Sequence, residues 1–217
     1  LCGGHTEVTD AVKRPVVSGM LCGTVDPRRL VDKKNMRAGD RLLMTKRIAV
    51  EGTAIIARDF CDRLKRHGVA AETIQAGAKL LSRISILAEA RIAADFPGVS
   101  AMHDVTEGGI ATAVEELSAA GGHQLQVRID RLRFFPETRR LCQATGIDPM
   151  GLIGSGSLLI TCRPDSVEAL TAALDGAGIE VAVIGEALSP GRGVKALDKD
   201  APARWPTFEA DELTRLF

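Results

Sequence analysis

Residues 103–110, His103-Asp104-Val105-Thr106-Glu107-Gly108-Gly109-Ile110, form the stretch that decides the fold of this chain. They follow a short run at residues 99–102 that is typical of a β-strand. After them, apolar residues recur with the spacing of one helix face from Ile110 to Leu117. The sequence therefore predicts a strand that ends in two carboxylates, a hydroxyl and a glycine pair, with a helix beginning at the glycines.

This strand–glycine–helix stretch has two interpretations. In the first, Gly108 and Gly109 let a ligand approach the backbone, and the helix start favours an anion. Asp104 and Glu107 would then hold Mg²⁺ beside a phosphate group. In the second, Thr106 caps the helix and the glycines are packing points. The local pattern alone favours neither.

The composition argues against several classes of partner. The chain of 217 residues has 28 Lys and Arg and 28 Asp and Glu, so its net charge gives no attraction to nucleic acid or an anionic membrane. Aromatic residues make up only 3%, which argues against a base-stacking surface. No apolar run approaches the roughly 18 residues of a membrane span. We therefore expect no nucleic acid and no membrane among its partners.

The cysteines and histidines show no metal-site spacing. The cysteines contain no Cys-x-x-Cys pair, and the four histidines are scattered along the chain. Wide spacing favours reduced core cysteines in a cytoplasmic protein. The cysteines are Cys2, Cys22, Cys61, Cys142 and Cys162.

The order of predicted elements indicates an α+β fold, in which helices cover a mixed sheet. Residues 1–32 fit a strand, a loop and a second strand, and a domain boundary follows them. The tail, 201–217, fits an irregular strand and a terminal helical turn. Periodicity and glycine positions predict further strands at 41–45, 125–129, 157–162 and 179–184, and helices at 56–68, 80–88, 110–121, 137–144 and 167–174.

Further short segments match a known family. The chain begins Leu-Cys-Gly-Gly-His5-Thr-Glu-Val-Thr9, and Pro15-Val-Val-Ser-Gly-Met-Leu-Cys-Gly-Thr-Val25 follows. Matches continue at 39–46, 48–54, 147–149 and 154–161. Together with residues 103–110, these segments resemble the AIR synthase superfamily over roughly residues 1–183. The resemblance is nearest to its hydrogenase-maturation, HypE-like branch.

The resemblance implies a domain division and a chemistry. Residues 1–35 would be the end of an N-terminal ATP-binding domain that is mostly missing, and 36–217 an AIR synthase-like C-terminal domain. The full-length protein would use ATP and Mg²⁺ for phosphoryl transfer or for amide or carbamoyl dehydration, and the piece alone would be inactive. Two alternatives stay open: a non-catalytic binding or regulatory module, and a true hydrogenase maturation protein without its terminal cysteine.

The resemblance also implies roles for individual residues. Asp104 and His5 would be catalytic. Glu7 and Glu107 would bind metal, although relatives have Arg or Gly at the place of Glu107, so their substrate does not transfer. Substrate or nucleotide binding would fall to Gly3, Gly4, Thr6, Lys46, Thr106, Gly108 and Gly109.

Purely structural interpretations are also open for some of these residues. His5 also fits a strand-end histidine bonded to backbone, and Lys46 also fits a surface lysine. His103 has no equivalent in the related motifs, and we interpret it as structural.

The resemblance finally implies a small-molecule substrate and protein partners. Superfamily members pair through their N-terminal sheets, so we expect a homodimer to which residues 1–32 contribute strands. The apolar segment Pro15–Val25 would be the template for this pairing. A HypE-like protein would also have a protein partner.

Overall fold

The computed structural model of the chain describes residues 3–217. Cys2 therefore lies outside the described residues, as does the start of the first predicted strand. The chain divides into two compact units, with the boundary between Leu30 and Val31. We describe each unit by itself.

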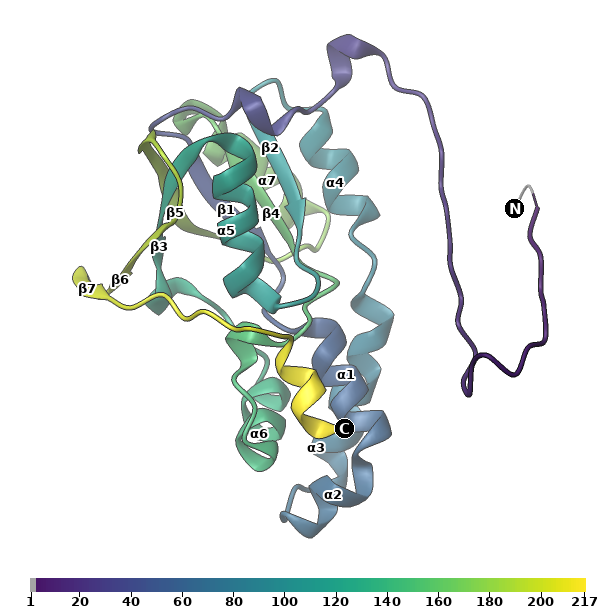
Figure 1. The fold of residues 1–217 in the computed structure, drawn as a ribbon. Coiled ribbons are helices and arrows are strands. Elements are labelled where there is room, and N and C mark those ends of the chain that lie inside the picture. Colours follow the sequence, from purple (N-terminus) through teal and green to yellow (C-terminus); the bar gives the residue numbers. More distant parts are fainter. Residues whose placement is uncertain (1–2) are drawn as a thin grey trace. The chain divides into compact units, whose positions relative to one another are not determined.

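A seven-stranded mixed sheet forms the second unit, in the order β2-β4-β1-β5-β3-β6-β7 (Figure 1). Neighbouring strands are antiparallel except β3 and β6, which are parallel. The prediction of a mixed sheet is therefore confirmed. The strands are β1 (Arg41–Thr45), β2 (Val99–Asp104), β3 (His123–Arg128), β4 (Leu158–Cys162), β5 (Val181–Pro190), β6 (Val194–Asp198) and β7 (Ala201–Ala203).

Helices cover the sheet, as predicted for an α+β fold. Figure 1 shows α5 on one side of the sheet and α7 on the other. The helices are α1 (Val50–Asp59), α2 (Cys61–Arg66), α3 (Ala71–Lys79), α4 (Leu87–Ala94), α5 (Gly109–Gly121), α6 (Pro136–Thr145) and α7 (Val167–Gly176). Short 3₁₀ turns are η1 (Pro27–Arg29), η2 (Lys33–Asn35), η3 (Leu80–Arg83), η4 (Ile129–Arg131), η5 (Pro149–Gly151), η6 (Pro164–Ser166) and η7 (Glu212–Leu216).

Alternation along β1 divides the interior into two cores. Leu42 and Met44 point into a large core that also contains residues of α5, α1 and α6. Leu43 points to the other face and packs with residues of α4 and α7. Successive side chains of a strand point to opposite faces, so the apolar run Leu42–Leu43–Met44 of β1 is buried on both.

The predicted helix at 80–88 is wrong in one respect. Its residues are divided between η3 and α4, and the chain leaves helical hydrogen bonding near Ser85. The ammonium of Lys46 binds the carbonyl oxygens of Arg83 and Ser85, at 3.1 and 2.7 Å. A side chain from a distant loop therefore satisfies acceptors that a continuous helix would use, which local periodicity cannot indicate.

The first unit contains no strand among its described residues, 3–30, so the predicted strand–loop–strand is wrong there. Beyond bends, η1 is its regular element. Most of its large apolar side chains are exposed, including Val17 at 92% and Leu21 at 99%. A strand needs a partner for its backbone N–H and C=O groups, and these residues pair with none in the structure.

The prediction that the cysteines lie in the core is confirmed for Cys142 and Cys162 and is wrong for Cys22, which is exposed. Burial raises the pKa of the Cys142 thiol to about 12 and that of Cys162 to about 11. Both side chains therefore stay protonated and poorly reactive at neutral pH. Cys61 is half-buried and Cys22 is exposed, and all four are free thiols. Among residues 3–217, no helix is long and apolar enough to cross a bilayer.

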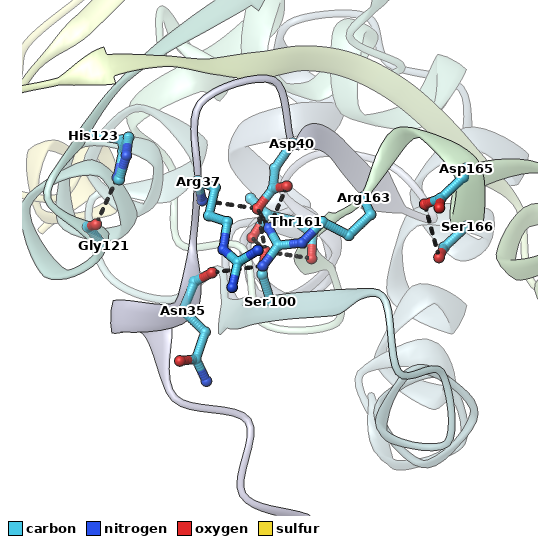
Figure 2. A network of polar contacts seen from close by, with 10 residues as sticks. All are labelled: Asn35, Arg37, Asp40, Ser100, Gly121, His123, Thr161, Arg163, Asp165 and Ser166. Carbon is cyan, nitrogen blue, oxygen red and sulfur yellow. Dashed lines mark hydrogen bonds and ion pairs between the residues drawn. The ribbon is translucent and has the colours of Figure 1, made fainter.

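A buried carboxylate joins the start of β1 to two neighbouring strands (Figure 2). The side chain of Asp40 is 1% exposed and pairs with the guanidinium of Arg163. It also accepts hydrogen bonds from Ser100 Oγ at 2.7 Å and from the Arg37 amide at 2.9 Å. Ser100 in turn contacts Thr161 Oγ1 at 2.9 Å. The network therefore links the start of β1 to β2 and β4.

Candidate functional site

Three connections meet at one edge of the sheet. β1 ends at Thr45, β2 ends at Asp104, and β4 begins at Leu158. Asp104 is paired directly with Leu158, and β1 runs antiparallel to β4 on its other side. The ends of β1 and β2 and the start of β4 therefore lie side by side. We call this the β2–α5 edge, after the connection 104–109 that carries most predicted site residues.

Backbone hydrogen bonds hold the connections of this edge together. The amide of Val105 donates to the Ser157 carbonyl at 3.1 Å, and the amide of Gly154 donates to the Thr106 carbonyl at 3.2 Å. The hydroxyl of Ser157 donates to the Arg47 carbonyl at 2.7 Å. The loop before β4 is thus bonded to both other connections, which gives the edge a defined backbone.

The glycine pair is used for close packing inside the protein. Gly108 and Gly109 have φ of 74° and 62°, the left-handed region that glycine adopts without strain. A Cβ on Gly109 would lie 2.6 Å from the Met150 carbonyl oxygen. The packing interpretation of Gly109 is therefore confirmed. The expected side-chain cap by Thr106 is absent: Gly108 is the N-cap, and Thr106 accepts the Gly109 amide through its carbonyl, at 3.1 Å.

The start of α5 already binds a carboxylate from the same chain. The Gly108 amide donates to Asp211 Oδ2 at 2.8 Å. The other oxygen of Asp211 accepts the Leu213 amide at 2.8 Å and caps η7. An anion does sit at this helix start, as the dipole argument expects, but it is a side chain 103 positions along the chain.

The C-terminal segment holds Asp211 in place from both sides. Trp205 Nε1 donates to the Ala111 carbonyl at 3.1 Å, inside α5. The buried carboxylate of Glu212 accepts the Asp148 amide at 2.9 Å. Sequence reasoning missed the contact between Asp211 and the Gly108 amide. An Asp before a helical turn indicates that Asp211 caps η7, but it does not indicate that the same carboxylate also binds the start of α5.

The two carboxylates of the β2–α5 edge remain accessible. The side chain of Asp104 is 56% exposed, and Glu107 is exposed. Among residues 3–217, no three His, Cys, Asp or Glu side chains cluster as a metal site would require. Mg²⁺ usually keeps several waters and takes one or two carboxylates plus substrate phosphates. Two accessible carboxylates meet this requirement only with further ligands from a phosphate group and water.

His103 lies behind Asp104 in a polar cluster. Lys33 Nζ is 2.9 Å from its Nδ1, and Glu116 Oε2 is 3.0 Å from its Nε2. An ammonium can only donate, so Nδ1 accepts a hydrogen bond from Lys33. Nε2 therefore carries the ring hydrogen and donates a hydrogen bond to Glu116. Asp104 Oδ1 lies 3.7 Å from Nδ1. His103 thus connects η2, β2 and α5, which agrees with its interpretation as a structural residue.

Lys46 follows a strand that ends at the β2–α5 edge, but its ammonium binds groups of the protein itself. Lys46 follows β1 directly, with φ of 54°. Besides the two carbonyls that interrupt the 80–88 helix, its Nζ pairs at 2.7 Å with Glu89, whose side chain is 1% exposed. Three acceptors match the three N–H groups of an ammonium. Protein groups therefore use all three N–H groups of Lys46, and we do not propose it as a phosphate ligand.

The residues predicted from the first motif lie in the first unit. His5 Nε2 is 3.4 Å from Glu7 Oε2, and the two side chains are 82% and 76% exposed. With Thr6, they line a hollow of about 550 Å³ that Val12 and Pro15 also border. Gly3 and Gly4 are exposed, and a Cβ on either would meet no atom within 4 Å. Their roles in binding a nucleotide stay predictions.

Comparison with known proteins identifies the family. Residues 37–197 match the family model described as AIR synthase related protein, C-terminal domain. The chain belongs to this family. The match contains every strand from β1 to β5 and most of β6, and therefore the whole β2–α5 edge except Asp211.

Curated relatives with a similar sequence are mostly hydrogenase maturation proteins. Carbamoyl dehydratase HypE of Cupriavidus necator is 28% identical over 174 residues, covering 78% of this chain and 46% of that protein. HypE of Escherichia coli is 29% identical, with 70% and 43% covered. Selenide, water dikinase of Dechloromonas aromatica is 27% identical, with 86% and 58% covered. The chain thus spans about half the length of these HypE proteins.

Solved structures agree with this assignment. Crystalline E. coli HypE superposes with a TM-score of 0.69 at 25% identity, covering 85% of this chain and 55% of that one. A HypE solved in complex with ATP has the same fold, with a TM-score of 0.59 at 19% identity. The predicted family and its HypE-like branch are therefore confirmed, as is the AIR synthase-like fold.

Proposed function

We propose that residues 36–217 act as the C-terminal domain of a HypE-like, ATP-dependent enzyme. Residues 1–35 would be the end of its ATP-binding domain. The observation that carries the proposal is Asp104, an exposed carboxylate at the edge where three connections of the matched domain meet. The curated relatives named carbamoyl dehydratase support the reaction class, the removal of water from a carbamoyl group. The HypE solved in complex with ATP supports the use of ATP.

The reaction requires few groups from this domain. The amide oxygen of the substrate attacks the γ-phosphate of ATP, the bond between the β- and γ-phosphates breaks, and ADP leaves. The C–O bond of the phosphorylated intermediate then breaks with release of inorganic phosphate, and the nitrogen loses its two protons in the course of the two steps, one of them to solvent, which leaves a nitrile. Asp104 would accept one of these protons. Mg²⁺, when bound, would neutralise phosphate charge, and in this domain Glu107 would be its protein ligand. For the first unit, taken by itself, the proposal keeps the roles that the resemblance implies: His5 as a catalytic residue, Thr6 as a nucleotide contact and Glu7 as a metal ligand.

The glycines have a narrower role in this proposal than the sequence predicts. The Gly108 amide is bonded to Asp211, and the Gly109 amide to Thr106. The two glycine amides therefore serve to shape the edge in this proposal, whereas the hydroxyl of Thr106 keeps its proposed role in binding substrate or nucleotide. Asp104 and Glu107 carry the chemistry that the edge can offer.

ATP binding tests whether the upstream part of such an enzyme is needed. We expect residues 1–217 to bind Mg²⁺–ATP no tighter than millimolar, because the chain spans only about half of its HypE relatives. A longer protein that includes the upstream domain should bind it at least tenfold more tightly, roughly 1.4 kcal/mol. Isothermal calorimetry of both proteins measures this. Equally tight binding by the two proteins would contradict the proposal that the upstream domain is needed to bind ATP.

A non-catalytic binding or regulatory module is the second candidate. It is favoured by the Asp211 contact, since a protein carboxylate already satisfies the helix start that a phosphate would otherwise use. ATP turnover distinguishes the candidates: a module would show none in the longer protein, with or without Mg²⁺.

Exposed apolar residues support a homodimer formed through the first unit. Val16, Val17, Met20 and Leu21 are all at least 77% exposed, in the segment expected to pair. We predict that residues 1–217 associate in solution and that residues 31–217 stay monomeric, because large exposed apolar patches mark association surfaces. Light scattering of both gives the result. A monomeric 1–217 with these residues in contact with solvent would contradict it.

We also propose a protein partner and a cytoplasmic location, in keeping with a HypE-like role. One solved neighbour of the same fold is titled as a HypE–HypF complex.

A further inference from the structure

A second concave site lies on the sheet, away from the β2–α5 edge. A cavity of about 540 Å³ opens over β1, β5 and β3, and its lining includes three arginine side chains. One of them, Arg41, is the first residue of β1, whereas the β2–α5 edge lies beyond the last, Thr45. Four residue steps along a strand span about 13 Å. The cavity is therefore a separate feature of the fold.

Strand register brings the polar residues of the cavity together. Arg41 on β1 is paired with Glu186 on β5, and Glu186 is paired with Gln126 on β3. The guanidinium of Arg41 forms an ion pair with Glu186, and Gln126 Nε2 is 3.4 Å from Glu186 Oε1. Three neighbouring strands thus present one polar row on the same face.

The cavity is hollow because the second core stops beside it. The apolar residues that pack under α4 and α7 end on β5, at Val181 and Val183. Gly185 contributes no side chain to the floor, and a Cβ there would lie 1.9 Å from the Gln126 carbonyl oxygen. The first turn of α7, at Val167, forms a wall. Backbone geometry therefore keeps the floor of the cavity open.

The lining has unused hydrogen-bond donors. It contains three guanidinium groups, from Arg41, Arg128 and Arg131, and one carboxylate, Glu186. The terminal nitrogens of Arg128 pair outside the cavity with Asp130 and Asp200. Its Nε is buried and has no hydrogen-bond partner among the described residues.

Arg131 is the least committed of the three cations. It is exposed, and within residues 3–217 its one hydrogen bond is from Nη1 to the Val183 carbonyl, at 3.4 Å. A guanidinium offers five N–H groups in a planar fork that matches phosphate and carboxylate oxygens. Arg131 can therefore turn several donors toward a ligand in the cavity.

We propose that this cavity binds the phosphate group of a small molecule. Its volume lies within the range of small-ligand sites, about 300–1,000 Å³. Phosphate offers several acceptor oxygens to the guanidinium groups of Arg41 and Arg131, and charge-assisted bonds of this kind are the strong ones. Glu186 forms an ion pair with Arg41, so a bound anion competes with this carboxylate for the guanidinium of Arg41. The site is independent of the ATP-dependent function proposed above.

Calorimetric titration of residues 1–217 with pyrophosphate tests the proposal. Arg131→Gln should weaken binding by about tenfold or more, since it removes a charged hydrogen-bond donor. Glu186→Gln should tighten binding, because it removes the one lining carboxylate and releases Arg41. Arg133→Gln is the matched control: Arg133 is an exposed arginine two positions away that borders the neighbouring hollow and not this cavity. Its affinity should equal that of the wild type.

Three results would overturn the proposal: Arg131→Gln binds as the wild type does, Arg133→Gln weakens binding equally, or a folded Glu186→Gln binds no more tightly. The last one keeps the test decisive if Arg131→Gln does not fold. Pyrophosphate bound at the β2–α5 edge instead would respond to Asp104→Asn and not to Arg131→Gln. Failure here therefore leaves the ATP-dependent proposal standing, and the reverse also holds.

Discussion

Replacing Asp40 by alanine should lower the free energy of unfolding by about 3 kcal/mol, the low end for breaking a buried ion pair. The side chain of Asp40 is almost fully buried, and its partner Arg163 is 26% exposed. Removing the carboxylate leaves that guanidinium without its counter-charge and Ser100 Oγ without its closest acceptor (Figure 2). At roughly 2–4 °C per kcal/mol, the melting temperature should fall by roughly 10 °C.

Asp165→Ala is the matched control for this experiment. Asp165 lies two positions from Arg163 and is exposed, and its one side-chain contact in Figure 2 is Ser166 Oγ at 3.5 Å. Substitution there should change stability by no more than about 0.5 kcal/mol. Urea unfolding of the three proteins provides the values. A loss under 1 kcal/mol for Asp40→Ala would mean that the network contributes little to joining β1, β2 and β4.

Local sequence patterns predicted the parts of the fold that depend on neighbours in the chain. The strand–glycine–helix stretch became β2 and α5, and the helix ends at Gly121, followed by Gly122 in the left-handed region. Helix periodicity fits α6 and α7 within two residues at each end. In these elements, spacing, glycine conformation and burial all favour the same structure.

Contacts between distant residues were not predictable in the same way. The ammonium of Lys46 is bonded to carbonyls 37 and 39 positions later, and the amide of Gly108 to Asp211, 103 positions later. The Pro15–Val25 segment has strand composition but no partner among the described residues. One sequence shows that such groups need partners, but not which partners the fold supplies.

Replacing Asp104 by asparagine should nearly abolish ATP turnover by the longer protein while the fold stays intact. The substitution keeps the size of the side chain and removes the charge that would accept a substrate proton. Losing such a group costs on the order of 3 kcal/mol in the activation barrier, or about a hundredfold in rate. The 56% exposure of Asp104 predicts little change in stability.

Glu116→Gln provides the control for this change. Glu116 is equally exposed, at 56%, and both carboxylates contact the imidazole of His103. The substitution therefore disturbs the same polar cluster without removing the proposed proton acceptor. Its turnover should stay within a few-fold of the wild type. A melting temperature lowered by Asp104→Asn at unchanged turnover would assign Asp104 a structural role instead.

The rate of Mg²⁺-dependent ATP hydrolysis, measured on the longer protein with its upstream domain, tests the central claim that the β2–α5 edge is catalytic. The account predicts measurable turnover in the wild type and in Glu116→Gln, and a loss of about a hundredfold in Asp104→Asn at equal thermal stability. Equal turnover in all three proteins, at equal stability, would contradict it.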